Sequence, residues 1–311
     1  MVLRRGDVEG SVPLLRRRED TMFHGSIVAT VTPFLNGKLD RKGLKKLVEF
    51  QVRNGTDGIV PCGTTGESAT LSFEEHEAVI GIVIEAAAGR VPVIAGTGSN
   101  NTKEAVTLTR FAKKAGADAA LVITPYYNKP TQEGLYRHFR AVAESADIPL
   151  VLYNVPGRTG VNMSPETVAR LAEVKNIVGV KEASGNLNQV CDIVRMTPKK
   201  FCVLSGDDAL FFPMMALGAK GVISVASNVA PRAMSDLYDA YVLGELSKAR
   251  EIHYRLWPLF HALFVETNPI PAKTALAMMK MIREEFRLPL CPMSDGNRKK
   301  LATVLSDLRL V

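Results

Sequence analysis

The sequence has few aromatic residues and no long apolar run. Phenylalanine, tryptophan and tyrosine make up 6% of the 311 residues, and there is a single tryptophan. No uncharged apolar stretch approaches the ~18 residues that a membrane-spanning helix needs. We therefore predict no association with the membrane. The hydrophobic share of 46% is that of an ordinary folded protein and excludes a disordered or collagen-like chain.

Cysteine is also scarce, and its spacing is uninformative for metal binding. The four cysteines form no CxxC pair and no metal-ligand pattern: Cys62, Cys191, Cys202 and Cys291. Free thiols are typical of a reducing compartment, so we expect a cytoplasmic protein.

The charge balance is basic, with 39 lysines and arginines against 32 acidic residues and a net charge of +7. Such a balance can indicate a nucleic acid or an anionic substrate as partner. The basic residues are scattered through predicted helices instead of forming a stripe with interleaved aromatics, which argues against nucleic acid. Small anions remain as candidate ligands.

Residues 1–21 differ in composition from the rest of the chain. Five arginines are offset by four acidic residues there, and the segment has no apolar core of signal-peptide length. Transit peptides are poor in acidic residues, so a transit peptide is disfavoured as well. We expect a flexible tail. Translation starting at Met22 is an alternative that the intact mass of the natural protein would test.

Eight short apolar runs alternate with amphipathic helical stretches from residue 26 onward. The runs are Ser26–Pro33, Gly58–Cys62, Val91–Gly96, Ala119–Thr124, Pro149–Asn154, Ile177–Lys181, Phe201–Ser205 and Gly221–Val225. Their nearly continuous hydrophobicity is typical of parallel strands covered on both faces. Eight strand–helix repeats predict an α/β fold of the (β/α)8 TIM-barrel type.

Several helix starts are marked by capping residues. Ser72 with Glu75 three residues later matches a capping box, and Asp40 can cap a helix that ends at Gly55. Ser164 followed by Pro165 is a further start signal.

The strand pattern stops after Gly244. Helices are predicted over Glu245–Val265, with a bend at Pro258, then after Asn268–Pro271, and over Asp295–Leu308. We therefore divide the chain into a tail (1–21), a catalytic barrel (22–244) and a C-terminal helical segment (245–311).

Lys181 is the most informative single residue, because it ends a predicted strand. Function in such barrels gathers at the C-terminal ends of the strands. Burial at the rim of an apolar interior disfavours the charged form of an amine, and a neutral amine can form an imine with a ketone. The alternative interpretation is a lysine that extends to solvent or pairs with Glu182.

Tyr153 ends the strand that should lie beside the strand of Lys181. Imine chemistry needs a proton shuttle, and a tyrosine hydroxyl can serve when other hydroxyls relay the proton. Thr64 and Tyr127, from two further strand ends, are candidates for that relay. Alternatively, Tyr153 is a core ring and Tyr127 a surface aromatic.

Two features could bind carboxylates. The run Gly63-Thr64-Thr65-Gly66 offers successive amides and hydroxyls as a small anion nest, and it lacks the lysine of a nucleotide-binding loop. Arg158 offers a fork for a second carboxylate. The plainer interpretations are a tight turn and a solvated arginine. We interpret the pair Asp207-Asp208 as helix caps rather than metal ligands.

Several ordered motifs resemble one enzyme family. They are GTTGES at 63–68, TPYYNKPTQEGLY at 124–136, YNVPGRTG at 153–160, VKEASGN at 180–186, SGDD at 205–208 and NPIP at 268–271. Together they resemble the dihydrodipicolinate synthase (4-hydroxy-tetrahydrodipicolinate synthase) family, which belongs to the N-acetylneuraminate lyase superfamily of pyruvate-dependent class I aldolases. The resemblance extends from Met22 to Val311.

The resemblance implies a lyase of lysine and diaminopimelate biosynthesis. Family members condense pyruvate with L-aspartate-4-semialdehyde, need no metal or organic cofactor, and are usually homotetramers built as dimers of dimers. Lys181 matches the Schiff-base lysine and Tyr153 the general acid/base. Thr64 and Tyr127 match the proton relay, in which the tyrosine reaches a neighbouring subunit's site. The matches to substrate-binding positions are Thr65, Ile223, Gly206 and Arg158.

A second set of residues matches the site at which sensitive members bind lysine as an inhibitor. The set is Ser68, Ala69, His76, Asn100, Glu104 and Tyr126. Phe73 departs from the pattern, because many sensitive members have histidine there and plant forms have tryptophan. We therefore predict weak or absent feedback by lysine.

Two other functions remain open from the sequence. Another Schiff-base lyase of the superfamily, cleaving sialic acid or a 2-keto-3-deoxy sugar acid, would share the lysine, the tyrosine and the nest. Arg158 within YNVPGRTG and the Tyr126-Tyr127-Asn128 set favour the synthase. A barrel that only binds pyruvate-like acids is the non-enzymatic alternative.

Overall fold

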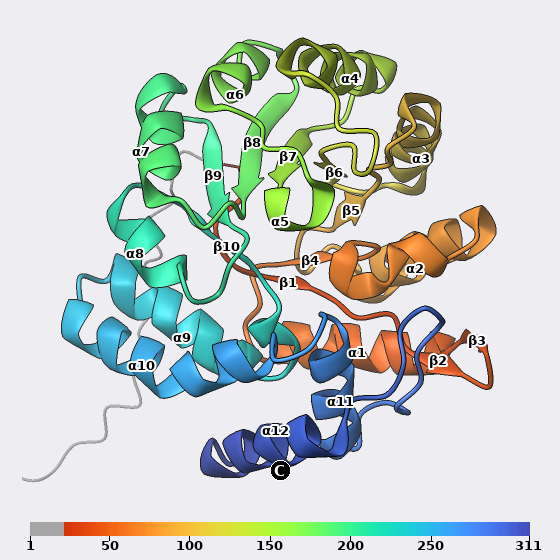
Figure 1. The fold of residues 1–311 in the computed structure, drawn as a ribbon, viewed down its shortest axis with the longest axis vertical. Coiled ribbons are helices and arrows are strands. Elements are labelled where there is room, and N and C mark those ends of the chain that lie inside the picture. The colour runs from red at the N-terminus through yellow and green to blue at the C-terminus, as the bar shows by residue number, and fades with distance from the viewer. Residues whose placement is uncertain (1–21) are drawn as a thin grey trace, which may run out of the picture.

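A closed barrel of eight parallel strands forms the centre of the molecule, in a computed structural model that describes residues 22–311 (Figure 1). The predicted tail lies outside these residues. The barrel strands are β1 (Gly25–Ala29), β4 (Gly58–Val60), β5 (Ile94–Gly96), β6 (Ala119–Ile123), β7 (Leu150–Asn154), β8 (Ile177–Glu182), β9 (Cys202–Ser205) and β10 (Gly221–Ser224). A parallel bridge between Ile59 and Val93 joins the two ends of the sheet. The predicted TIM-barrel fold is confirmed.

Helices cover the outside of the barrel and explain why the strands are apolar on both faces. These helices are α1 (Arg41–Arg53), α2 (Phe73–Ala87), α3 (Thr102–Ala115), α4 (Gln132–Ser145), α6 (Pro165–Leu171), α7 (Leu187–Met196), α8 (Phe211–Ala216) and α9 (Pro231–Val242). One side of each strand packs into the barrel interior and the other against these helices.

The predicted helix starts are confirmed by the capping contacts. The Asp40 side chain accepts a hydrogen bond from the Gly43 amide at the start of α1. Ser72 and Glu75 form both bonds of a capping box at the start of α2. Each cap satisfies amides that have no acceptor within their own helix, so the sequence marks these boundaries locally.

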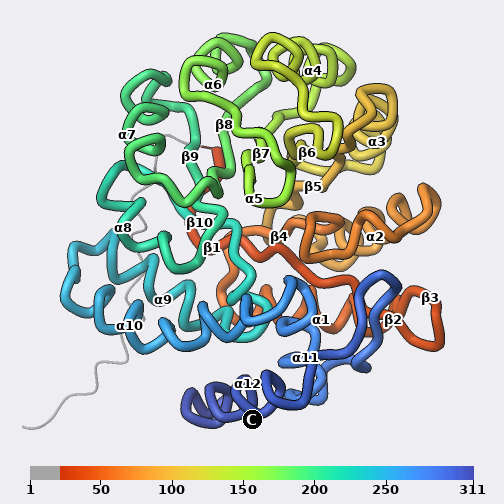
Figure 2. Tube along the Cα trace, viewed as in Figure 1, coloured from red at the N-terminus to blue at the C-terminus, as the bar shows by residue number. Residues whose placement is uncertain are grey.

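Three further helices follow the barrel: α10 (Leu246–Ala262), α11 (Ile270–Met278) and α12 (Asp295–Asp307). α10 packs against α9, and α12 packs against α10 and α11. The four helices share a separate apolar core, at the lower side of the view in Figure 2. Pro258 lies inside α10, which ends three residues before the predicted Val265. The division of the chain at residue 244 stays a prediction.

A small hairpin was not predicted. The strands β2 (Phe34–Leu35) and β3 (Lys38–Leu39) flank the turn Asn36-Gly37, a dipeptide that favours such turns. Both turn amides donate to the carboxylate of Glu285, at 2.9 and 2.5 Å, so the hairpin joins the C-terminal segment.

The remaining short elements are α5 (Pro156–Thr159) and the 3-10 turns η1 (Thr64–Gly66), η2 (Ser68–Thr70) and η3 (Ala226–Asn228). All four follow barrel strands. Within residues 22–311, no helix has both the length and the apolar character that crossing a bilayer requires.

Candidate active site

Lys181 and Tyr153 lie side by side at the ends of two neighbouring strands. In the parallel pairing of β7 with β8, Tyr153 is the register partner of Lys181. The Lys181 amine lies 4.2 Å from the centroid of the Tyr153 ring, and the two residues are 5% and 6% exposed. The amine and the phenol are thus brought together, as expected from the strand order, while their chemical roles stay predictions.

The pairing of Lys181 with Glu182, the alternative considered above, is disfavoured by the contacts of the carboxylate. Glu182 accepts hydrogen bonds from the Asn154 side chain (3.0 Å), the Gln189 side chain (3.2 Å) and the Ser184 amide (2.7 Å). Adjacent residues of a strand face opposite sides of the sheet, so Glu182 points away from the barrel interior that holds the amine.

Gly206 leaves the space that the Lys181 side chain fills. A Cβ atom at position 206 would lie 3.1 Å from Lys181 Cε and 2.6 Å from the Ala183 Cβ. Any larger residue would therefore clash with Ala183 and crowd the Lys181 stem. Ile223, on β10, is fully buried among the interior residues.

The predicted carboxylate nest, Gly63–Gly66, contains the 3-10 turn η1 in the loop after β4. Thr65 is 2% exposed, and its hydroxyl accepts a hydrogen bond from the Asn268 side chain at 3.0 Å. On the opposite side the Thr32 hydroxyl donates to the Gly66 carbonyl at 2.7 Å. The loop is therefore fixed from both the barrel and the C-terminal segment.

Arg158 is carried by α5 and reaches the same C-terminal residue. Its Nη2 donates to the Asn268 carbonyl at 3.3 Å. Asn268 thus contacts both candidate carboxylate-binding residues, a role that spacing in the sequence gave no means to predict. Only its place in the NPIP motif pointed to it.

A cavity of about 450 Å³ opens between these elements. Thr64, Tyr153 and Arg158 contribute to its walls. Tyr127, in contrast, is 89% exposed, and its amide donates to the Thr159 carbonyl at 3.4 Å. Within a single chain, Tyr127 is therefore not brought to the candidate relay.

The predicted effector residues line the same cavity. Its walls include Ser68, Ala69, His76, Glu104 and Tyr126, while Asn100 donates from its side chain to the Tyr126 carbonyl at 3.2 Å. Burial lowers the pKa of His76, whose Nε2 lies 2.7 Å from the Gly96 carbonyl oxygen. Phe73, the residue that departs from the pattern, also contributes and is 46% exposed.

A thiol also lines the cavity, but its environment disfavours it as a nucleophile. Burial raises the pKa of Cys62 far above its ordinary value, and the reactive form of cysteine is the thiolate. Cys62 is thus a poor nucleophile at this end of the barrel.

The interpretation of Asp207-Asp208 as helix caps is wrong for both residues, because α8 begins at Phe211 and no side chain caps its start. Asp208 binds another strand end instead. Its carboxylate accepts from the amides of Val225 (3.0 Å) and Ala226 (2.8 Å), across the barrel end, because the side chain points inward toward β10. Burial raises the pKa of Asp208 to about 6. Asp207 makes the local contact instead, accepting from the Ala209 amide at 2.9 Å. No three His, Cys, Asp or Glu side chains of residues 22–311 form a metal-binding group.

Comparisons with known proteins agree with this geometry. Residues 22–308 match the Dihydrodipicolinate synthetase family. A 4-hydroxy-tetrahydrodipicolinate synthase from Geobacter sulfurreducens is 59% identical over 290 residues, which are 93% of this chain and all of that protein. The crystal structure of dihydrodipicolinate synthase from Aquifex aeolicus is 57% identical with a TM-score of 0.92, covering 93% of this chain and 99% of that one.

A third similar protein is the synthase from Cyanidioschyzon merolae, solved with lysine bound. It is 44% identical with a TM-score of 0.91, covering 94% of this chain and all of that one. The family match spans nearly the whole described chain, and it includes every motif on which the resemblance rests. The chain therefore belongs to the dihydrodipicolinate synthetase family.

Proposed function

We propose that this chain is a lyase that condenses pyruvate with L-aspartate-4-semialdehyde, in the biosynthesis of diaminopimelate and lysine. The observation that carries the proposal is the buried pair of Lys181 and Tyr153 at adjacent strand ends, with Tyr153, Thr64 and Arg158 lining one cavity. The names of the 4-hydroxy-tetrahydrodipicolinate synthase relatives support the same activity.

The chemistry follows from the residue types. The Lys181 amine attacks the ketone carbon of pyruvate, and loss of water from the carbinolamine gives an imine. Tyr153 removes a proton from the methyl carbon, so that the imine becomes an enamine. That carbon attacks the aldehyde, whose oxygen takes up a proton. The amine of the semialdehyde then displaces Lys181 as the ring closes.

Binding groups hold both substrates in this scheme. Thr64 and Thr65 bind the pyruvate carboxylate, with Ile223 and Gly206 lining its position, and Arg158 receives the carboxylate of the semialdehyde. Orientation of two reactants in one cavity contributes to the rate beyond proton transfer itself. The scheme needs neither a metal nor an organic cofactor, because the imine formed on Lys181 acts as the electron sink.

Tyr127 suggests that the working enzyme is an oligomer. It is 89% exposed, yet a tyrosine at this point of the motif belongs to the family's proton relay. We therefore include in the proposal that Tyr127 enters a neighbouring subunit's site, that the chain forms a homotetramer as a dimer of dimers, and that it acts in the cytoplasm.

Parallel activity assays distinguish the synthase from other Schiff-base lyases. With pyruvate and aspartate semialdehyde we expect turnover, measured as formation of the cyclic product. With sialic acid or a 2-keto-3-deoxy sugar acid we expect no release of pyruvate, because in this proposal Arg158 is the receptor for the semialdehyde carboxylate. Cleavage of a sugar acid without condensation would contradict the proposal.

Lysine is expected to inhibit the wild-type enzyme weakly or not at all. Phe73 opens α2 at the mouth of the effector region, where many sensitive enzymes carry a ring with a hydrogen-bonding nitrogen. Assays of the condensation at sub-millimolar lysine should therefore show unchanged rates. The matched variant Phe73→His should gain inhibition, and strong inhibition of the wild-type enzyme would contradict the prediction.

A further inference from the structure

A second buried lysine lies near the site and is not used by the proposed chemistry. Lys273, on α11, is completely buried, and its amine lies 2.5 Å from Glu67 Oε1. The Glu67 side chain is completely buried as well. Among residues 22–311, Lys273 and Lys181 are the two buried lysines. Unlike Lys181, Lys273 is engaged by a carboxylate.

Stability alone does not account for this ion pair. The Lys273 amine also lies 4.3 Å from the Phe34 ring centroid and 5.2 Å from that of Phe286. Burial lowers the pKa of Lys273, while the Glu67 carboxylate opposes that shift. Buried ion pairs are often no more stabilising than well-packed apolar residues, because desolvation offsets their attraction.

Glu67 has an unusual backbone conformation for its residue type. It joins η1 to η2 with φ at 53° and ψ at 35°, a left-handed conformation that is unfavourable for a residue with a Cβ. Its amide donates to the Thr64 carbonyl at 3.2 Å, and its carbonyl accepts from the Thr70 amide at 3.0 Å. Strain of this kind persists only where surrounding contacts hold it, and it concentrates at functional sites.

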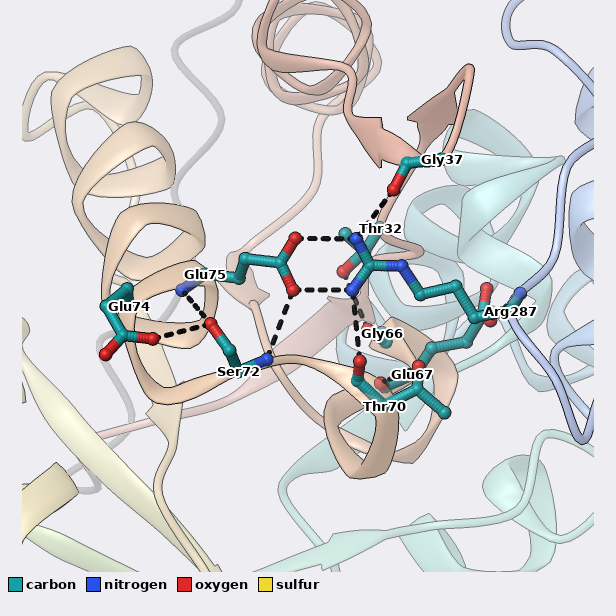
Figure 3. Close-up of polar contacts among 9 residues, drawn as sticks. All are labelled: Thr32, Gly37, Gly66, Glu67, Thr70, Ser72, Glu74, Glu75 and Arg287. Carbon is teal, nitrogen blue, oxygen red and sulfur yellow. Dashed lines mark hydrogen bonds and ion pairs between the residues drawn. The ribbon is translucent and has the colours of Figure 1, made fainter.

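The C-terminal segment supplies those contacts from more than one direction. The second carboxylate oxygen of Glu67 accepts from the Arg287 amide at 3.3 Å. Figure 3 shows the Arg287 guanidinium facing the Glu75 carboxylate. Its two nitrogens donate to the two carboxylate oxygens at 2.5 and 2.6 Å. The same guanidinium donates to the Thr70 carbonyl at 3.0 Å. Asn268 binds the Thr65 hydroxyl from the other side.

We propose that Lys273 is a positioning residue for keto-acid binding: through Glu67 it holds loop 63–68 in the conformation that presents Thr64 and Thr65 to the substrate carboxylate. This inference rests on the proposed function and deepens it, because it assigns the second buried lysine to the pyruvate side of the same site. Lys273 itself contacts no reacting atom in this account.

The test measures half-saturation, the pyruvate concentration at which trapping by borohydride is half-maximal, in the Lys273→Met variant. Trapping is followed by intact mass. We expect half-saturation to rise about tenfold or more, because the loop loses its anchor. The Arg298→Met variant is the matched control. It removes a partly buried C-terminal ion pair with Glu284 that does not contact the loop, and it should trap pyruvate like wild type.

A second variant keeps the test decisive if the unpaired Glu67 prevents folding. The double variant Glu67→Gln with Lys273→Met carries no buried charge at this point, so it should fold, and half-saturation should still rise about tenfold. Wild-type half-saturation in a folded variant, even one with a lower melting temperature, would show a purely structural role and overturn the inference. Failure of the wild-type enzyme to trap pyruvate would instead overturn the proposed function.

Discussion

The Lys181→Ala variant should lose condensation activity by at least ~10³-fold, because the other buried lysine, Lys273, is paired with Glu67 and cannot replace it in forming the imine. Borohydride treatment with pyruvate should add mass to the wild-type chain and none to the variant. Peptide mapping should place the adduct on position 181. The variant should stay folded, since alanine removes one side chain at the rim and leaves the strand pairing of β8 intact.

Lys273 provides an internal control for this experiment. It is the other buried lysine of the described chain, and its amine is held by Glu67. An adduct on Lys273 or on a surface lysine, or undiminished turnover by the variant, would refute the mechanism. A wild-type chain that binds pyruvate without gaining covalent mass would favour the non-enzymatic alternative.

The Tyr153→Phe variant should reduce kcat by ~10²–10⁴-fold, the usual contribution of a positioned proton-transfer group. The ring and its contact with the Lys181 amine are retained in phenylalanine, so the loss reports the hydroxyl rather than packing. Steady-state kinetics would measure the effect, and trapping with pyruvate should slow because imine formation also requires proton transfer.

Tyr136→Phe is the matched control for that substitution. Tyr136 lies on α4, where the Arg170 guanidinium stacks on its ring at 4.2 Å, and it is not among the residues that line the cavity. This variant should retain full activity. A Tyr153→Phe enzyme with near wild-type kcat would assign the proton transfers to another group.

The barrel was predictable because its signals are local. Each strand is a short apolar run, and each cap, such as Ser72 with Glu75, satisfies amides within one turn. The meeting of Tyr153 with Lys181 followed from strand order alone. The exact strand ends were less accurate: the first predicted run extends to Pro33, whereas β1 ends at Ala29.

The contacts that hold the site loops in place were not predictable, because they join distant parts of the chain. Lys273 meets Glu67 across 206 positions, and Asn268 meets Thr65 across 203. No periodicity or spacing encodes such a contact. The inward turn of Asp208 was missed for the same reason, since its partners lie on another strand end. The role of Tyr127 stays a prediction, since its side chain is 89% exposed in the single chain.

The contacts of the C-terminal segment bear on how such enzymes can be recombined. Asn268, Lys273 and Arg287 come after the last barrel strand, yet each contacts the loop region that follows β4. A chimera that combines the barrel of one family member with the C-terminal helices of another must take positions 67 and 273 from the same parent. In this protein, a segment that is transferred with its site intact must include the C-terminal helices as well as the barrel.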